Sequence, residues 1–240
     1  MPSFATLRTE YDELWRSMVI HADKTESVSR IARRLIGLKS RYQAVARRTG
    51  VPWFVIAALH ERESNADFDS YLGNGDPLRS PTRHVPSGRG PFASWEVGAI
   101  DALHHDGLDR ARPWTPARAC YEIERFNGFG YRLHHAQVKS PYLWSFSNHY
   151  AHGKYVADGR FDSAAVDAQC GAMPIVKRIM ELDASAGFPA TRKPAVAATT
   201  AAAAGAAAAL AQHSLTAALA LALAAELAIA GMYLWRKFHP

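Results

Sequence analysis

A cluster of ionisable side chains follows an apolar run near the first quarter of the chain. The run from Val51 to Leu59 is almost entirely apolar, and Pro52 near its start suits the first turn of a helix. It therefore predicts a buried helix. His60, Glu61 and Glu63 follow at once, so this helix would carry carboxyl groups out of a hydrophobic core. Burial disfavours an ionised carboxylate, and the resulting rise in pKa suits a general acid.

A second carboxylate lies in the turn-rich segment that follows. Residues 73–77 read Gly-Asn-Gly-Asp-Pro, a composition typical of turns. Asp76 in such a polar loop would stay ionised while Glu63 stays protonated, the division of roles that acid catalysis requires. An alternative is that Asp76 only accepts backbone N–H bonds within the turn.

The same residues carry a resemblance to a known family. Glu63 and Ser64 at the end of an apolar helix resemble the Glu-Ser pair of goose-type lysozymes and lytic transglycosylases, where this Glu is the catalytic acid. A longer series, between Tyr11 and Met180, is similar to phage endolysins and bacterial muramidase-like proteins of the lysozyme superfamily, and it is close to the tail-anchored endolysins. The motifs are His60 with Glu63, Tyr71 to Leu78, Val85 to Arg89, Trp95 with Glu96, Ala99 to Leu103, Asn127 to Tyr131, Ser140 to Ser145, and Asn148 with Tyr150.

This resemblance implies a mainly α, lysozyme-like α+β fold with a small loop or β lobe. It implies hydrolysis of the β-1,4 bond between N-acetylmuramic acid and N-acetylglucosamine, with Glu63 as the acid. We expect Asp76 to orient water or stabilise the oxocarbenium-like transition state, with Glu61 and Glu96 as weaker candidates. Retaining, inverting and lytic transglycosylase outcomes stay open, and no cofactor is expected.

Aromatic and amide side chains are the candidates for substrate binding, because they suit the half-apolar faces of sugar rings. We expect this role for Tyr71, Tyr142, Asn148 and Tyr150. The neighbouring Trp144 and Phe146 fit a core position equally well.

Several other helices are predicted around these residues. Apolar stripes between residues 4 and 48 indicate two helices joined near residues 22–27. Three prolines and two glycines between residues 79 and 91 predict an irregular loop or a small hairpin, where lysozyme-type folds carry a β-rich lobe. Further helices are expected at 95–103, 121–126 and 166–182, with a glycine turn at 127–131 where backbone approaches a ligand. The catalytic domain would span residues 1–190.

The composition changes abruptly after Pro194. Residues 191–213 are rich in alanine and predict a linker, and residues 214–236 predict a transmembrane helix. An apolar helix of this length spans roughly 30 Å, the thickness of the hydrocarbon core of a bilayer, and the cations Arg236 and Lys237 follow interfacial aromatics. Glu226 inside the segment would cost about 2.5 to 3.5 kcal/mol near the centre unless it is protonated or paired.

The charge of the chain limits the classes of partner to consider. The formal net charge is +6, which favours an acidic polymer or surface. We expect peptidoglycan and the host bacterial inner membrane as partners and no nucleic acid, because no basic motif interleaves with aromatics. The enzyme would act on the periplasmic wall with a monomeric catalytic domain.

The first fifteen residues carry charges without an apolar run, so no cleavable secretory signal is expected. Cys120 and Cys170 read as buried thiols.

Two other classes of function are kept as alternatives. His60 and Glu61 begin like the HExxH motif of zinc peptidases or amidases, but Ser64 stands where the second His is required. The adjacent pairs His104 with His105 and His134 with His135 diverge on a helix, so no metal site is expected. A non-catalytic, membrane-anchored wall-binding protein is the second alternative.

Overall fold

The computed structural model describes residues 2–189, and this part of the chain is mainly helical. Two short 3₁₀ segments (Ala22–Lys24 and Leu108–Arg110) and one two-stranded antiparallel hairpin, β1 with β2, complete the regular structure of these residues. The prediction of a mainly α domain is confirmed. The helices and strands are α1 (Phe4–Ser17), α2 (Thr25–Gly37), α3 (Lys39–Thr49), α4 (Trp53–Ser64), α5 (Trp95–His105), α6 (Pro116–Asn127), α7 (Gly130–His134), α8 (Pro141–Trp144), β1 (Lys154–Ala157), β2 (Arg160–Asp162) and α9 (Ala172–Leu182).

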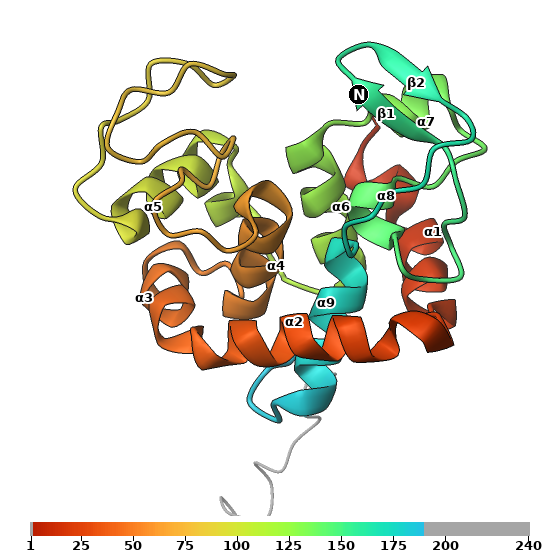
Figure 1. Cartoon of the computed structure of the whole chain (residues 1–240). Coiled ribbons are helices and arrows are strands. Elements are labelled where there is room, and N and C mark those ends of the chain that lie inside the picture. The colour runs from red at the N-terminus through yellow and green to blue at the C-terminus, as the bar shows by residue number, and fades with distance from the viewer. Residues whose placement is uncertain (1, 190–240) are drawn as a thin grey trace, which may run out of the picture. The chain divides into compact units, whose positions relative to one another are not determined.

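Helix α4 lies in the middle of the domain (Figure 1). Every residue from Trp53 to Glu61 is buried, so the apolar run is covered on all sides, as expected for a helix without a polar face. It packs against α3 and α9. The helix runs on beyond Leu59 and ends where Asn65 and Ala66 take left-handed backbone conformations, with φ of 55° and 58°. Glu63 therefore lies in the last turn of the buried helix.

Helix α2 runs below α4 and crosses in front of α9 (Figure 1), against which it packs. Its buried residues Val28, Ala32 and Leu35 recur at helical spacing and form its inner face. The prediction of two helices before residue 50 was wrong in number. Helix α2 ends at Leu38, whose N–H donates to the carbonyls of Leu35 and Ile36. Helix α3 begins one residue later. The apolar stripe continues through the break, so the periodicity does not reveal it.

The prediction of an irregular loop or a small hairpin at residues 79–91 is confirmed in its first form. Residues 79–91 form an irregular loop without strands, because its prolines supply no N–H donors to a ladder. Thr82 holds the loop together instead: its N–H donates to the carbonyl of Arg89 and its Oγ1 accepts from the N–H of Arg89. The two strands lie later in the chain, at β1 and β2.

The predicted final helix also starts later than expected, at Ala172 rather than Val166. Asp167 precedes it in a non-helical segment, where its N–H donates to the hydroxyl of Tyr150. No helix within residues 2–189 is long and apolar enough to cross a membrane. The predicted linker (191–213) and transmembrane helix (214–236) lie outside the described residues.

Candidate active site

The carboxyl group of Glu63 is held by a tyrosine from a separate helix. Tyr142 lies on α8, a single turn that begins with Pro141. Its hydroxyl donates a hydrogen bond to Oε1 of Glu63 across 2.5 Å. The guanidinium of Arg62 lies 4.7 Å from the centre of the Tyr142 ring, a cation–π distance. Glu63, Tyr142 and Arg62 thus form one contact group between α4 and α8.

The environment of Glu63 favours a protonated carboxyl group. Burial is the largest influence and raises the pKa of Glu63 to about 7. The hydrogen bond from Tyr142 and the charge of Arg62 act in the opposite direction, and the charge of Asp106 adds to the rise. A carboxyl group with a pKa near 7 is both protonated and able to release its proton at neutral pH, which is the requirement for a general acid.

A buried ion pair fixes Arg62 below this group. Arg62 bonds Oδ2 of Asp167 across 3.0 Å, and Lys154 from β1 bonds Oδ1 of the same carboxylate across 2.8 Å. The side chains of Arg62 and Asp167 are 7% and 1% exposed. Burial alone would raise the pKa of Asp167, but the charges of Arg62 and Lys154 lower it below its usual value, so the pair stays ionised. The pair ties α4 to the segment before α9.

Asp76, the predicted second carboxylate, lies beside the end of α4 but is bonded to its own loop. A Cβ placed on Gly75 would lie 3.1 Å from the carbonyl oxygen of Glu63, so the two backbones are in close approach. The Asp76 carboxylate is buried and accepts from the N–H groups of Arg83 and His84 at 2.7 and 2.9 Å, and its Oδ1 lies 2.6 Å from Nδ1 of His84. These bonds, with that of the His84 N–H first, lower the pKa of Asp76. It is ionised, and its oxygens organise the 79–91 loop.

Asp106 is a carboxylate that the sequence reasoning missed. It caps α5, and its half-buried position raises the pKa of its carboxyl group, against the charges of His105 and Arg125. Its charge acts on Glu63, while no hydrogen bond from its carboxylate to residues 2–189 is present. No sequence motif identifies Asp106, because its electrostatic interaction with Glu63 arises only when α5 packs into the domain.

The predicted substrate-binding residues are spread over the domain. Tyr142 contacts Glu63, but the hydroxyl of buried Tyr71 donates to Asp101 across 2.9 Å. The amide of Asn148 bonds the backbone of Ser17 and Val19. The hydroxyl of Tyr150 accepts from the N–H of Asp167 and donates to the carbonyl of Gly153. Of these four, the structure brings only Tyr142 into a hydrogen bond with Glu63.

The remaining acidic candidates are paired with arginines. Glu61 bonds Arg34 across 2.5 Å, and Glu96 bonds Arg41 across 2.7 Å. His60, part of the zinc-motif alternative, is fully buried, with Nε2 2.9 Å from the carbonyl of Asp67 and Nδ1 3.2 Å from the hydroxyl of Tyr42. Both ring nitrogens therefore have protein partners. No group of three or more potential metal-binding side chains occurs in residues 2–189.

Among the hollows near these residues, two bear on ligand binding. One of about 320 Å³ lies between α2, the end of α4 and residues 168–170. The other, of about 500 Å³, lies between residues 127–131 and the hairpin, and Tyr131 and Tyr155 line it. The glycine turn at 127–131, predicted to approach a ligand closely, forms one wall of the second hollow. Its tyrosines offer aromatic faces of the kind that bind sugar rings.

Comparisons of the chain with protein-family models, with curated protein sequences and with solved structures found no match.

Proposed function

We propose that this protein is a lysozyme-type peptidoglycan hydrolase with Glu63 as its general acid. The observation that carries the proposal is the position of Glu63 in the last turn of the buried helix α4, with a pKa of about 7 and a hydrogen bond from Tyr142. The finer assignment of the fold, an α+β arrangement of the lysozyme type, belongs to the same proposal. In it, the irregular segment at 66–94 takes the place of the small loop or β lobe.

The reaction begins with the proton of Glu63. It passes to the oxygen of the β-1,4 bond, the bond from C1 of the N-acetylmuramic acid breaks, and the leaving sugar departs as an alcohol. Positive charge then develops at C1, and a second carboxylate stabilises it or orients the water that adds there. In a retaining course the water gives its proton back to Glu63; in an inverting course the second carboxylate takes that proton, and Glu63 is reprotonated from solvent.

Asp76 and Asp106 are the two carboxylates proposed for the second role. Asp76 is ionised and close to α4, but three donors occupy its oxygens. Asp106 has no such bonds within residues 2–189 and interacts electrostatically with Glu63. The freedom of its carboxylate favours Asp106, and the two substitutions described in the Discussion separate the candidates.

Peptidoglycan is the proposed substrate for two reasons. The motif series that includes Tyr71 to Leu78 and Asn127 to Tyr131 resembles that of muramidase-like endolysins. The net charge of +6 also suits an anionic wall polymer. Mass analysis of products tests the proposal directly: purified peptidoglycan is incubated with the full-length protein and with its Glu63→Gln variant. Disaccharide-peptide products from the wild type alone support it.

Free peptides with intact glycan strands, formed by a chelator-sensitive activity, would instead indicate a zinc amidase or peptidase. Binding to the wall without any cleavage would indicate the non-catalytic alternative. Both outcomes contradict the glycosidase proposal.

We also propose that residues 214–236 anchor the enzyme in the bacterial inner membrane. The support is compositional: a long apolar segment followed by Arg236 and Lys237. Full-length protein should fractionate with membranes and resist high-salt extraction, because salt screens surface charge but not a spanning helix. Deletion of residues 195–240 should release a soluble, active domain. Release of the full-length protein by salt alone would contradict the anchor.

A further inference from the structure

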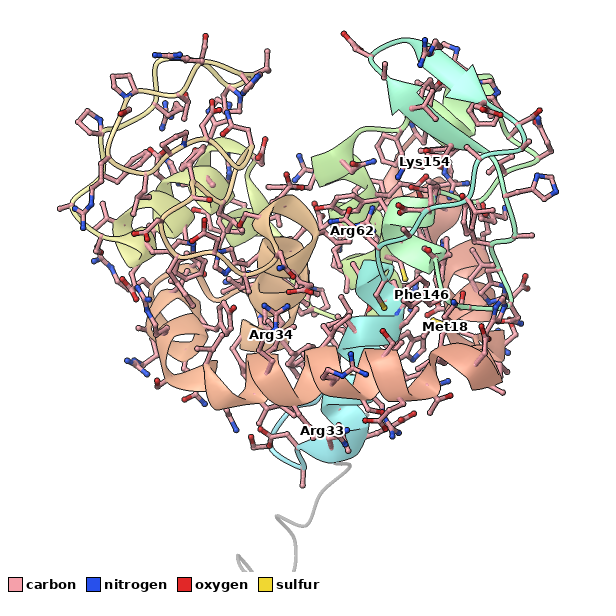
Figure 2. All side chains as sticks on the ribbon, viewed as in Figure 1. Met18, Arg33, Arg34, Arg62, Phe146 and Lys154 are labelled. Atoms are coloured by element: carbon pink, nitrogen blue, oxygen red, sulfur yellow. The ribbon has the colours of Figure 1, made fainter. Side chains whose placement is uncertain are left out.

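The hollow of about 320 Å³ beside the end of α4 is lined by three arginines. Arg30 and Arg34 come from α2, and Arg62 comes from α4. Figure 2 shows Arg34, Arg62 and Phe146 around the space above α2, whereas Arg33 points away below that helix. Phe146 supplies an apolar wall.

The positive charge of this hollow exceeds its negative charge. Arg34 bonds Glu61 and the carbonyl of Asn65, and Arg62 bonds Asp167. The guanidinium of Arg30 makes no hydrogen bond or ion pair with residues 2–189. One exposed cation is therefore unpaired at the rim, next to two whose positions are fixed by buried or half-buried carboxylates.

Neutral donors face the same space. The Asn65 side chain uses its oxygen to accept from Arg34, which leaves its NH₂ group available. The amide of Gln169 also lines the hollow and has no side-chain partner in the described part of the chain. An arginine flanked by amides and an apolar wall is a set of groups that binds a carboxylate within a peptide, because guanidinium matches a carboxylate with two parallel hydrogen bonds.

The backbone around this hollow is held in unusual conformations. Phe146 has a φ of 72° and Asn65 a φ of 55°, both in the left-handed region that non-glycine residues rarely adopt. The N–H of His21 bonds the carbonyl of Phe146 across 3.0 Å and fixes that conformation. Such conformations persist where the surrounding structure enforces them, often at binding sites.

Arg62 connects the hollow with the surroundings of the proposed acid, Glu63. Arg62 lines the hollow and also stacks on Tyr142, which bonds Glu63. When the glycosidic bond lies at Glu63, the N-acetylmuramic acid on one side of that bond would bring its branch toward Arg62. In peptidoglycan, that branch is a short peptide with free carboxylates.

We propose that this hollow binds a carboxylate of the peptide that branches from the glycan strand, with Arg30 as the main contact. The proposal rests on the proposed function, since it names the part of peptidoglycan recognised beside the cleaved bond. The enzyme would then prefer peptide-bearing glycan to glycan from which the peptides have been removed.

The test compares Arg30→Ala with Arg33→Ala in the full-length protein. The control removes the same charge from the same helix, but Arg33 bonds Glu26 on the surface and lies outside the hollow. Calorimetry with the tripeptide L-alanyl-γ-D-glutamyl-diaminopimelate measures binding without any turnover. We expect Arg30→Ala to weaken binding roughly tenfold, as for the loss of a charged hydrogen bond, and Arg33→Ala to leave it unchanged.

A second measurement compares cleavage of intact peptidoglycan with cleavage of peptide-free glycan strands. Wild type and Arg33→Ala should prefer the intact polymer, and Arg30→Ala should lose that preference. Equal weakening by both variants, or no tripeptide binding by the wild type, would overturn the proposal. Cleavage of both polymers at equal rates without tripeptide binding would support the hydrolase function and refute peptide binding in the hollow. Tripeptide binding that depends on Arg30, without cleavage of either polymer, refutes the hydrolase alone.

Discussion

The hydroxyl of Tyr142 and the carboxyl group of Glu63 share a hydrogen bond of 2.5 Å, and this bond opposes the effect of burial on the acid. Burial stabilises the neutral carboxyl group, whereas a phenol that donates to it stabilises the carboxylate. The pKa of about 7 is the balance of these two effects with the charges of Arg62 and Asp106. Tyr142, expected from the sequence to bind sugar, is thus in a position to set the proton affinity of Glu63.

Tyr142→Phe should therefore raise the pKa of Glu63 further. The alkaline limb of the pH–rate profile, which follows loss of the proton from Glu63, should move to higher pH. The folded state should lose about 0.5 to 1.5 kcal/mol, the net value of one hydrogen bond. Rates measured between pH 5 and 9 check the shift. A limb displaced to lower pH would contradict the assigned role of the phenol.

Asp106→Asn should move the same limb in the opposite direction. The negative charge of Asp106 raises the pKa of Glu63, so its removal should lower that pKa and the pH at which activity falls. Because the Asp106 carboxylate makes no hydrogen bond to residues 2–189, the melting temperature should not fall. If Asp106 is the second carboxylate, the maximal rate should also drop. A pH profile that matches that of the wild type would separate Asp106 from the site.

Glu63→Gln should abolish most of the turnover while the domain remains folded. Glutamine keeps the size of the side chain and can still accept from Tyr142, but it has no proton to donate. General acid catalysis by one group contributes roughly 10² to 10⁴-fold, and release of soluble fragments from peptidoglycan measures the loss. Circular dichroism serves as the folding control. Activity within a few-fold of wild type in a folded variant would disprove the assignment.

Asp76→Asn should lower stability and activity together. The carboxylate accepts three hydrogen bonds from Arg83 and His84. Asparagine replaces one of its two oxygens by an NH₂ group, which cannot accept the hydrogen bonds made to that oxygen. Loss of one buried acceptor costs roughly 1–3 kcal/mol. Thermal melting and rate, measured on the same preparation, check this. A large fall in rate at an unchanged melting temperature would show instead that Asp76 acts in the reaction.

His60 should contribute a loss of stability on acidification below about pH 6.5, opposite in sign to the contribution of Glu63, whose raised pKa of about 7 favours the folded domain as the pH falls toward 4.5. Burial lowers the pKa of His60 to about 4. Between pH 4 and pH 6.5, the histidine is therefore protonated in the unfolded chain but neutral in the folded domain. The stabilisation is complete above pH 6.5 and is lost as the pH falls toward 4, by up to about 3 kcal/mol. Denaturant unfolding at pH 7 and pH 4.5 measures it. Between these two pH values the wild type should lose more stability than His60→Gln, in which the contribution of Glu63 is left alone. His134→Gln, a change at an exposed histidine, should behave as the wild type.

The position of Glu63 was predictable because the signal is local. An uninterrupted apolar run followed at once by carboxyl groups defines both the buried helix and the residue at its end. The break between α2 and α3 was not predictable in this way, because the apolar spacing is the same on both sides of Leu38.

The contacts that surround Glu63 join residues far apart in the chain. Arg62 bonds Asp167, and Tyr142 bonds Glu63, only after α8 and the segment before α9 pack against α4. Sequence spacing does not encode these pairs, so Asp106 and the arginine-lined hollow were missed. The composition of residues 142–150 suggested sugar binding, but only the Tyr142 hydroxyl bonds Glu63, whereas the polar groups of Asn148 and Tyr150 bond nearby backbone.

Burial of α4 from Trp53 to Glu61 has a consequence for the motions of the molecule. Amide protons exchange with solvent only when their hydrogen bonds open, and the slowest exchange occurs in elements that open only with global unfolding. The amides of α4 should therefore be among the last to take up deuterium, while those of the 79–91 loop exchange early. The acid would be carried by the most persistent segment of the domain, and the parts that contact a polymer could rearrange around it without displacing the proton donor.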